Sequence, residues 1–187
     1  MWTTSAAPPC STCGPRSYWA GPMLGDRWGV SDEETLRRYP CDDFVPAPTL
    51  RAWRGVSVDA PPAAVWQWVG QIRLAPYSYD WIDNLGRRSP QLLVGLAEPV
   101  VGEPFTTAGG RRRGRILAVE PGLHLTGRIM GAVLSYVLVP EAGDGTRLLL
   151  KVVMRTNPVI ALGGCLGDLV MARRQLLNLK RLAEQSA

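Results

Sequence analysis

The last stretch of the chain carries a long helical pattern. Apolar residues recur there at alternating four- and three-residue steps, which places them along one side of an α-helix. This stripe consists of Cys165, Leu169, Ala172, Leu176, Leu179 and Ala183. Asp168 and Gln175 fall off the stripe, and an acidic residue near the helix start suits the helix dipole. Because Gly163-Gly164 come just before, we predict a long amphipathic helix that begins near Cys165.

Much of the chain before this helix alternates between apolar and polar residues, as β-strands do. The first such strand covers Leu50 to Val58, and its apolar face is interrupted by Arg54. Further strands are predicted at 104–107, 113–120, 123–129, 133–140 and 146–155. Gly143-Asp144-Gly145 is typical of a hairpin turn and joins the last two of them.

Short helices are expected on either side of the first strand. Ser31 and Glu34 have the spacing of a capping box, which predicts a short helix from there to about Arg38. After the strand, Asp59 followed by Pro61-Pro62 is typical of a helix start. A sheet of mostly consecutive strands with the helices gathered on one side is an α+β domain.

The length of 187 residues is enough for one domain with a substantial core. Residues 1–27 are rich in Pro, Gly and Ser without periodicity, so we predict a poorly ordered arm followed by a single domain over 28–187. No apolar run reaches the ~18 residues that span a bilayer. The first residues also lack a basic segment followed by an apolar one, so we expect a cytoplasmic protein.

Several short segments resemble one superfamily when they are taken in order. They are Trp28-Gly29 with Asp32-Glu33-Glu34, Asp42 to Pro46, Ala60-Pro61 to Trp68, Tyr77-Ser78-Tyr79-Asp80-Trp81, and Asn84-Leu85. The pattern is similar to the helix-grip superfamily (SRPBCC), which includes START lipid-transfer domains and polyketide cyclases, and within it to a bacterial branch of cyclase-like and lipid-transport-like proteins. It covers about Trp28 to Glu184, and the Tyr-Ser-Tyr-Asp-Trp run is its most specific part.

This resemblance implies a curved antiparallel sheet of about seven strands wrapped on the C-terminal helix, with two short helices after the first strand. It also implies a cavity between the sheet and that helix that takes apolar molecules. No catalytic motif is shared across the superfamily, so the resemblance transfers no catalytic residue.

Aromatic residues near the short helices are our candidates for the wall of such a cavity. Trp66, Tyr77, Tyr79 and Trp81 combine large rings with polar tips, which suits the binding and orientation of an apolar or aromatic guest. The same rings could simply close the core. Arg173, at the edge of the helix stripe, could neutralise a ligand carboxylate or extend along the helix edge.

The leading hypothesis is therefore a domain that binds a hydrophobic or aromatic small molecule as a carrier, sensor or sequestering protein. An enzyme of the cyclase or dehydratase type is the alternative, with Asp80, Tyr79 or His124 as acid–base groups. His124 is the single histidine, and in a strand it would point away from Leu123 and Leu125. Neither hypothesis calls for a cofactor.

The net charge of +5 comes partly from Arg111-Arg112-Arg113 with Arg115. The simplest interpretation is a solvated hairpin end, and a third hypothesis uses it to dock on a membrane, RNA or protein. From the sequence we expect only weak, salt-sensitive contact with anionic surfaces. Cys10 and Cys13 form a Cys-x-x-Cys pair, but it lies in the Pro-rich arm and we predict no metal site.

Overall fold

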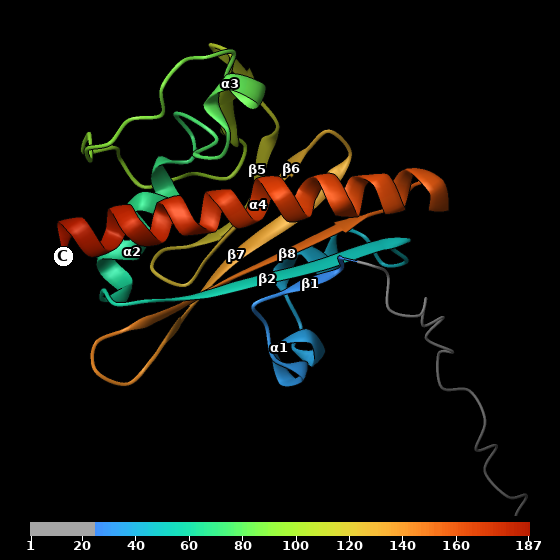
Figure 1. Ribbon diagram of the computed structural model, residues 1–187, viewed down its shortest axis with the longest axis horizontal. Coiled ribbons are helices and arrows are strands. Elements are labelled where there is room, and N and C mark those ends of the chain that lie inside the picture. The colour runs from blue at the N-terminus through green and yellow to red at the C-terminus, as the bar shows by residue number, and fades with distance from the viewer. Residues whose placement is uncertain (1–24) are drawn as a thin grey trace, which may run out of the picture.

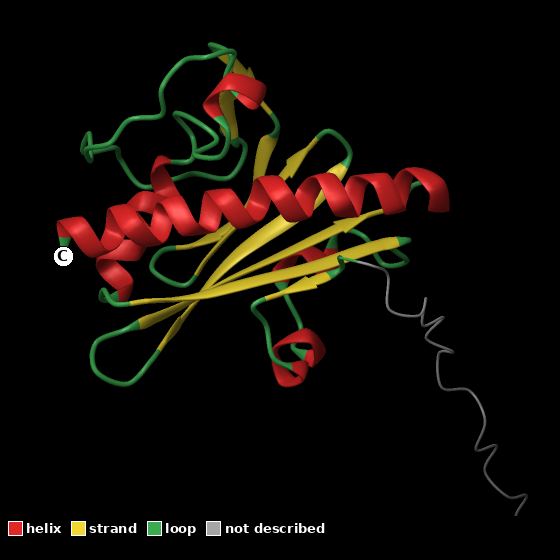
Figure 2. Ribbon diagram, viewed as in Figure 1, coloured by secondary structure: helices red, strands yellow, loops and turns green. Residues whose placement is uncertain are grey.

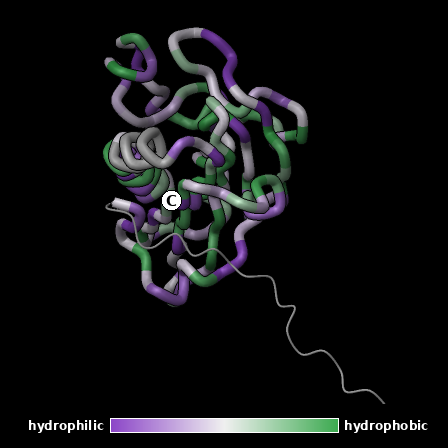
Figure 3. Tube along the Cα trace, turned by 90° about the vertical axis from the view of Figure 1, so that its right-hand side faces the viewer, coloured by the Kyte–Doolittle hydropathy of each residue, from purple (hydrophilic) through white to green (hydrophobic). Residues whose placement is uncertain are grey.

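The computed structural model describes residues 25–187, and for residues 158–166 it describes the backbone alone. The main sheet and the long helix α4 (Pro158–Ser186) form two layers, and α4 lies across one face of the sheet (Figures 1 and 2). Figure 3 shows α4 nearly end-on beside that face. This is the helix-grip arrangement expected from the sequence, and the α+β class is confirmed. Cys10, Cys13 and the side chain of Cys165 lie outside the described residues.

The main sheet has six strands in the order β1-β2-β8-β7-β6-β5. Its strands are β1 (Arg27–Trp28), β2 (Leu50–Val58), β5 (Arg115–Glu120), β6 (His124–Ile129), β7 (Ala132–Pro140) and β8 (Thr146–Met154). A separate hairpin pairs β3 (Thr106–Ala108) with β4 (Arg111–Arg113). All pairs are antiparallel except β1 with β2. The bounds of β2 are those predicted, because its alternation and flanking turns are strong local signals.

The remaining helices are short. They are α1 (Asp32–Leu36), the 3-10 helix η1 (Pro40–Asp43), α2 (Pro62–Gln71) and α3 (Asp80–Asp83). The capping box at α1 is confirmed: the Glu34 amide donates to Ser31 Oγ at 3.2 Å, and the Ser31 amide donates to Glu34 Oε2 at 2.8 Å.

The predicted start of α4 was too late. The helix begins at Pro158, a residue suited to the first turn, and continues through Gly163-Gly164. Each glycine costs about 1 kcal/mol relative to alanine, which is too little to end a helix that packs along a sheet. Asp168 therefore lies in the middle of α4 rather than at its start. No helix among the described residues is long and apolar enough to cross a membrane.

The two faces of the sheet are covered differently. Leu176, Leu179 and Ala183 of α4 are fully buried against the inner face, as the stripe predicts. The outer face is covered by the segment that precedes β2, which buries Tyr39 and Cys41 against β7 and β8. In Figure 1, α1 lies on the side of the sheet opposite to α4.

Candidate functional site

The aromatic run at residues 76–81 leaves α2 and is folded back against α4. Tyr77 adopts a φ of 57° and is 1% exposed. Its ring meets Trp68 edge-on with centroids 6.1 Å apart, and its hydroxyl accepts a hydrogen bond of 2.7 Å from Gln71 Nε2. Burial raises the pKa of Tyr77 to about 12. Tyr77 is thus a fixed part of the core that positions the residues after it.

Two sets of hydrogen bonds hold this run in place. From α4, Asn178 Nδ2 donates to Tyr77 O at 2.8 Å, and Ser78 Oγ donates to Met171 O at 2.9 Å. From the following loop, the amide and hydroxyl of Ser89 donate to the two carboxylate oxygens of Asp80 at 2.8 and 2.6 Å. The Asp80 carboxylate therefore holds the two ends of the segment 80–89 together.

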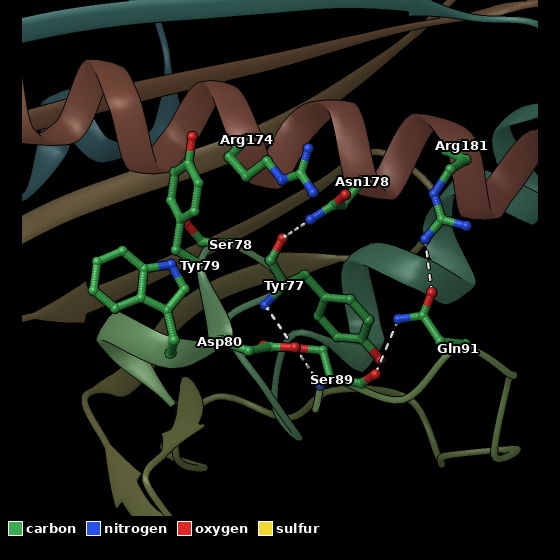
Figure 4. A pocket seen from close by; sticks show the side chains of 10 residues that line it. Tyr77, Ser78, Tyr79, Asp80, Ser89, Gln91, Arg174, Asn178 and Arg181 are labelled. Carbon is green, nitrogen blue, oxygen red and sulfur yellow. Dashed lines mark hydrogen bonds between the residues drawn. The ribbon is translucent and has the colours of Figure 1, made fainter. Parts of the chain in front are cut away.

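Between this run and α4 lies a hollow of ≈ 270 Å³ (Figure 4). It is lined by Tyr77, Ser78, Tyr79, Asp80, Trp81, Ser89, Gln91, Arg174, Asn178 and Arg181. The guanidinium of Arg174 lies 5.8 Å from the centroid of the Tyr79 ring, a cation–π distance. Arg181 Nη2 donates to Gln91 Oε1 at 2.6 Å and closes the far end. The hollow thus combines aromatic rings with two cations.

The structure brings together three of the five residues proposed for the ligand wall. Tyr77, Tyr79 and Trp81 line the hollow, although Trp81 is 74% exposed at its rim. Trp66 lines a separate hollow of ≈ 190 Å³ against the loop 93–99, where its Nε1 donates to Glu98 Oε2 at 2.9 Å. Arg173 lies instead over the ring of Trp28, 5.3 Å from the centroid. Its neighbour Arg174, one residue or about 100° further around the helix, faces the hollow.

His124 lies far from this hollow. It is on the outer face of the sheet, in a hollow of ≈ 360 Å³ with Tyr39 and Leu149. Its Nε2 is 3.6 Å from Glu120 Oε2, and burial lowers its pKa below the ordinary value of 6.5 against the opposing effect of Glu120. His124 and Asp80 are therefore on opposite sides of the sheet and cannot act on one substrate.

An interior ion pair beneath α4 was missed from the sequence. Arg54 Nη2 lies 3.0 Å from Asp168 Oδ2, and the Arg54 side chain is fully buried. Burial outweighs the arginine and raises the pKa of Asp168 to about 6. Both residues gave a signal, because Arg54 interrupts the apolar face of β2 and Asp168 interrupts an apolar run of α4.

A second polar contact between the sheet and α4 lies beside this ion pair. Arg54 and Tyr136 both pair with Leu150 across the sheet, and Asp168 and Gln175 are seven residues apart on α4. Seven residues are two helical turns, so both pairs meet across the same interface. Tyr136 donates to Gln175 Oε1 at 2.5 Å, and Gln175 Nε2 donates to Pro76 O at 2.5 Å. Gln175, predicted off the buried stripe, thus joins the sheet to the aromatic run.

No family model matches the chain, and no curated protein sequence matches it. Solved structures similar to it include a protein from Mesorhizobium loti at 19% identity, covering 73% of this chain and 98% of that one with a TM-score of 0.48. A protein from Arthrobacter aurescens matches at 15% identity over 73% and 87% of the two chains, with a TM-score of 0.48. An AHSA1-like protein from Aeromonas hydrophila matches at 18% identity over 72% and 93%, with a TM-score of 0.44.

Proposed function

We propose that the protein binds a small molecule with an aromatic or apolar body in the hollow between the run 76–81 and α4. The observation that carries this proposal is the pairing of the Tyr79 ring with the Arg174 guanidinium on the wall of a preformed hollow. Binding sites of this kind combine apolar or aromatic walls with a few placed polar groups. Carrier, sensor and sequestering roles all follow from such binding.

The cations suggest the polar end of the ligand. Arg174 makes no ion pair within residues 25–187, and Arg181 is hydrogen-bonded only to neutral glutamine side chains in the same part of the chain. A guanidinium at the wall favours a carboxylate or sulfonate, which it can bind through two hydrogen bonds. We therefore propose an aromatic ligand with one anionic group, the ring against Tyr79 and the anion toward Arg174.

The enzyme alternative receives less support from the geometry. The carboxylate of Asp80 already accepts two hydrogen bonds from Ser89, and His124 is on the other face of the sheet. Acid–base catalysis needs such groups within hydrogen-bond reach of one substrate. Binding without chemistry is the function that these residues support best.

Titration with the fluorescent probe 1-anilinonaphthalene-8-sulfonate tests the proposal. Arg174→Ser and Tyr79→Ala should each weaken binding about tenfold, or ~1.4 kcal/mol, while circular dichroism stays unchanged. Arg173→Ser is the matched control, because it removes the adjacent arginine of the same helix from outside the hollow. Equal effects at positions 173 and 174, or probe binding unchanged by both Arg174→Ser and Tyr79→Ala, would show that the hollow is not the site.

A further inference from the structure

At the rim of the hollow, α3 and the turn that follows it present large apolar side chains to solvent. Trp81 is 74%, Ile82 48% and Leu85 76% exposed. Single exposed apolar residues are common on protein surfaces, whereas several that lie together are typical of an interaction surface. All three belong to a five-residue stretch, so they necessarily lie close together.

The backbone at Leu85 adds a second observation. Its φ is 52°, in the left-handed region that favours glycine and is costly for a leucine. Such a conformation usually persists where the surrounding structure requires it, yet here it holds an apolar side chain out toward water. The Gly86 amide donates to Asp80 O at 2.7 Å, so the turn that ends α3 fixes this conformation and holds Leu85 at the surface.

Basic side chains lie next to this apolar group. Arg87, Arg88, Arg111, Arg112 and Arg113 are all exposed. None of the five makes an ion pair with another residue in the described range 25–187. They come from two segments, the loop after α3 and strand β4, which are far apart in the sequence but adjacent in space.

Direct contacts fix these two segments to each other. The Gly109 amide, in the turn between β3 and β4, donates to Asn84 Oδ1 at 3.0 Å. A Cβ at Gly109 would lie 2.7 Å from Leu85 Cδ1, and one at Gly110 would lie 2.6 Å from Arg87 Nη1. The turn therefore passes directly under the side chains of Leu85 and Arg87. In Figure 1, α3 and this hairpin form one corner of the molecule, on the side away from α1.

The acidic groups near this corner are mostly engaged. Glu103 pairs with Arg73 at 2.9 Å, and Asp80 accepts its two hydrogen bonds from Ser89. Asp83 is partly buried, and burial together with Asp80 raises its pKa to about 6. The exposed charge of the corner is therefore predominantly positive.

We propose that the corner formed by α3 and the β3–β4 hairpin docks on an anionic lipid bilayer. Tryptophan and aliphatic side chains partition into the interfacial region of a bilayer, while arginines bind the lipid phosphates beside them. RNA fits less well, because single-stranded bases stack on aromatic rings and make little use of Ile82 and Leu85. Two of the three exposed apolar side chains are aliphatic, which favours a lipid bilayer as the partner.

Co-sedimentation of the full-length protein with vesicles tests this proposal independently of any ligand. Binding to phosphatidylcholine vesicles with about 30% phosphatidylserine should exceed binding to pure phosphatidylcholine by more than tenfold, and should weaken between about 0.05 and 0.5 M NaCl. Replacing Arg111, Arg112 and Arg113 together by serine should lower it about a hundredfold. The pair Ile82→Ser and Leu85→Ser should lower it about tenfold.

A matched control comes from the opposite side of the sheet. Leu36 is 74% exposed beside Arg37, so the pair Leu36→Ser and Arg37→Ser removes comparable groups and should leave vesicle binding unchanged. Equal loss from this control would contradict a specific docking corner. If the arginine variant loses vesicle binding while the Ile82 and Leu85 variant keeps it, the surface recognises polyanions such as RNA and the bilayer proposal is wrong. Probe binding in the hollow is measured separately with Tyr79 and Arg174 variants, so the two proposals fail independently.

Discussion

Replacing Asp168 in the ion pair between Arg54 and Asp168 should lower the free energy of unfolding more than replacing Arg54. The perturbation is Asp168→Asn, which keeps the shape of the side chain and removes its charge. Arg54 would remain fully buried, and it would keep its hydrogen bonds to the Asp26 and Trp53 carbonyl oxygens at 2.8 Å. Removing one partner of a buried pair costs about 3–5 kcal/mol, because the other charge stays out of water. The burial that raises the pKa of Asp168 to about 6 disfavours the ionised carboxylate and offsets about 3 kcal/mol of that cost, so Asp168→Asn should cost about 1–2 kcal/mol.

The exposures of the two side chains make the effects asymmetric. At 3.0 Å and an effective dielectric constant of about 20, the attraction is about 5–6 kcal/mol before desolvation is subtracted. Asp168 is 24% exposed and can take up a proton when its partner is lost, whereas Arg54 cannot lose its proton. Arg54→Met should therefore cost less than Asp168→Asn, about 1 kcal/mol, because it leaves no buried cation and Asp168 can be protonated. The double variant Arg54→Met with Asp168→Leu should cost about 3 kcal/mol less than the sum of the single changes.

Urea unfolding followed by circular dichroism measures these differences, at a pH of about 7.5 where Asp168 is ionised. The slope of the transition should be the same in all variants, so that midpoints report stability. The absence of any cost for Asp168→Asn would mean that water reaches Arg54. Additive effects in the double variant would mean that the two side chains do not interact.

Two further predictions concern other parts of the fold. Leu176→Ala removes a fully buried side chain of α4 and should cost about 2–5 kcal/mol in urea unfolding, whereas Val170→Ala, at a position 52% exposed, should cost less than about 0.5 kcal/mol; similar costs would refute the placement of the stripe. His124 is the single histidine, so its ring protons give an unambiguous NMR titration, and its pKa should lie below 6.5. Since the unfolded chain then binds the proton more tightly, His124 should favour folding above pH 6.5 and lose that contribution as the pH falls through this value; a titration at or above 6.5 would contradict the burial of the ring.

Local signals in the sequence predicted much of the fold. The alternation of Leu50 to Val58 and the capping box at Ser31 depend on neighbouring residues, and both are confirmed. The start of α4 was misplaced because glycine signals the end of a helix only when no packing opposes it. The exposure of Trp81 could not be read from the sequence, because α3 has four residues and shows no periodicity that would distinguish an inner from an outer side.

The candidate site was harder to predict because it depends on which residues meet across elements. Arg173 was predicted to reach the ligand, but it lies over Trp28, and Arg174 lies in the hollow. The two positions differ by one residue, which is about 100° around the helix.

The Arg54–Asp168 pair shows what could have been inferred. Arg54 interrupts the apolar face of β2 and Asp168 interrupts an apolar run of α4, and the helix-grip arrangement packs these two elements together. An isolated charge on either face would be too costly to bury, so two opposite charges on facing elements predict each other. A charge on β2 and an opposite charge on α4 thus place Asp168 toward the sheet, and Gln175, two helical turns further on, with it. The buried side of α4 would then include its polar residues as well as its apolar stripe.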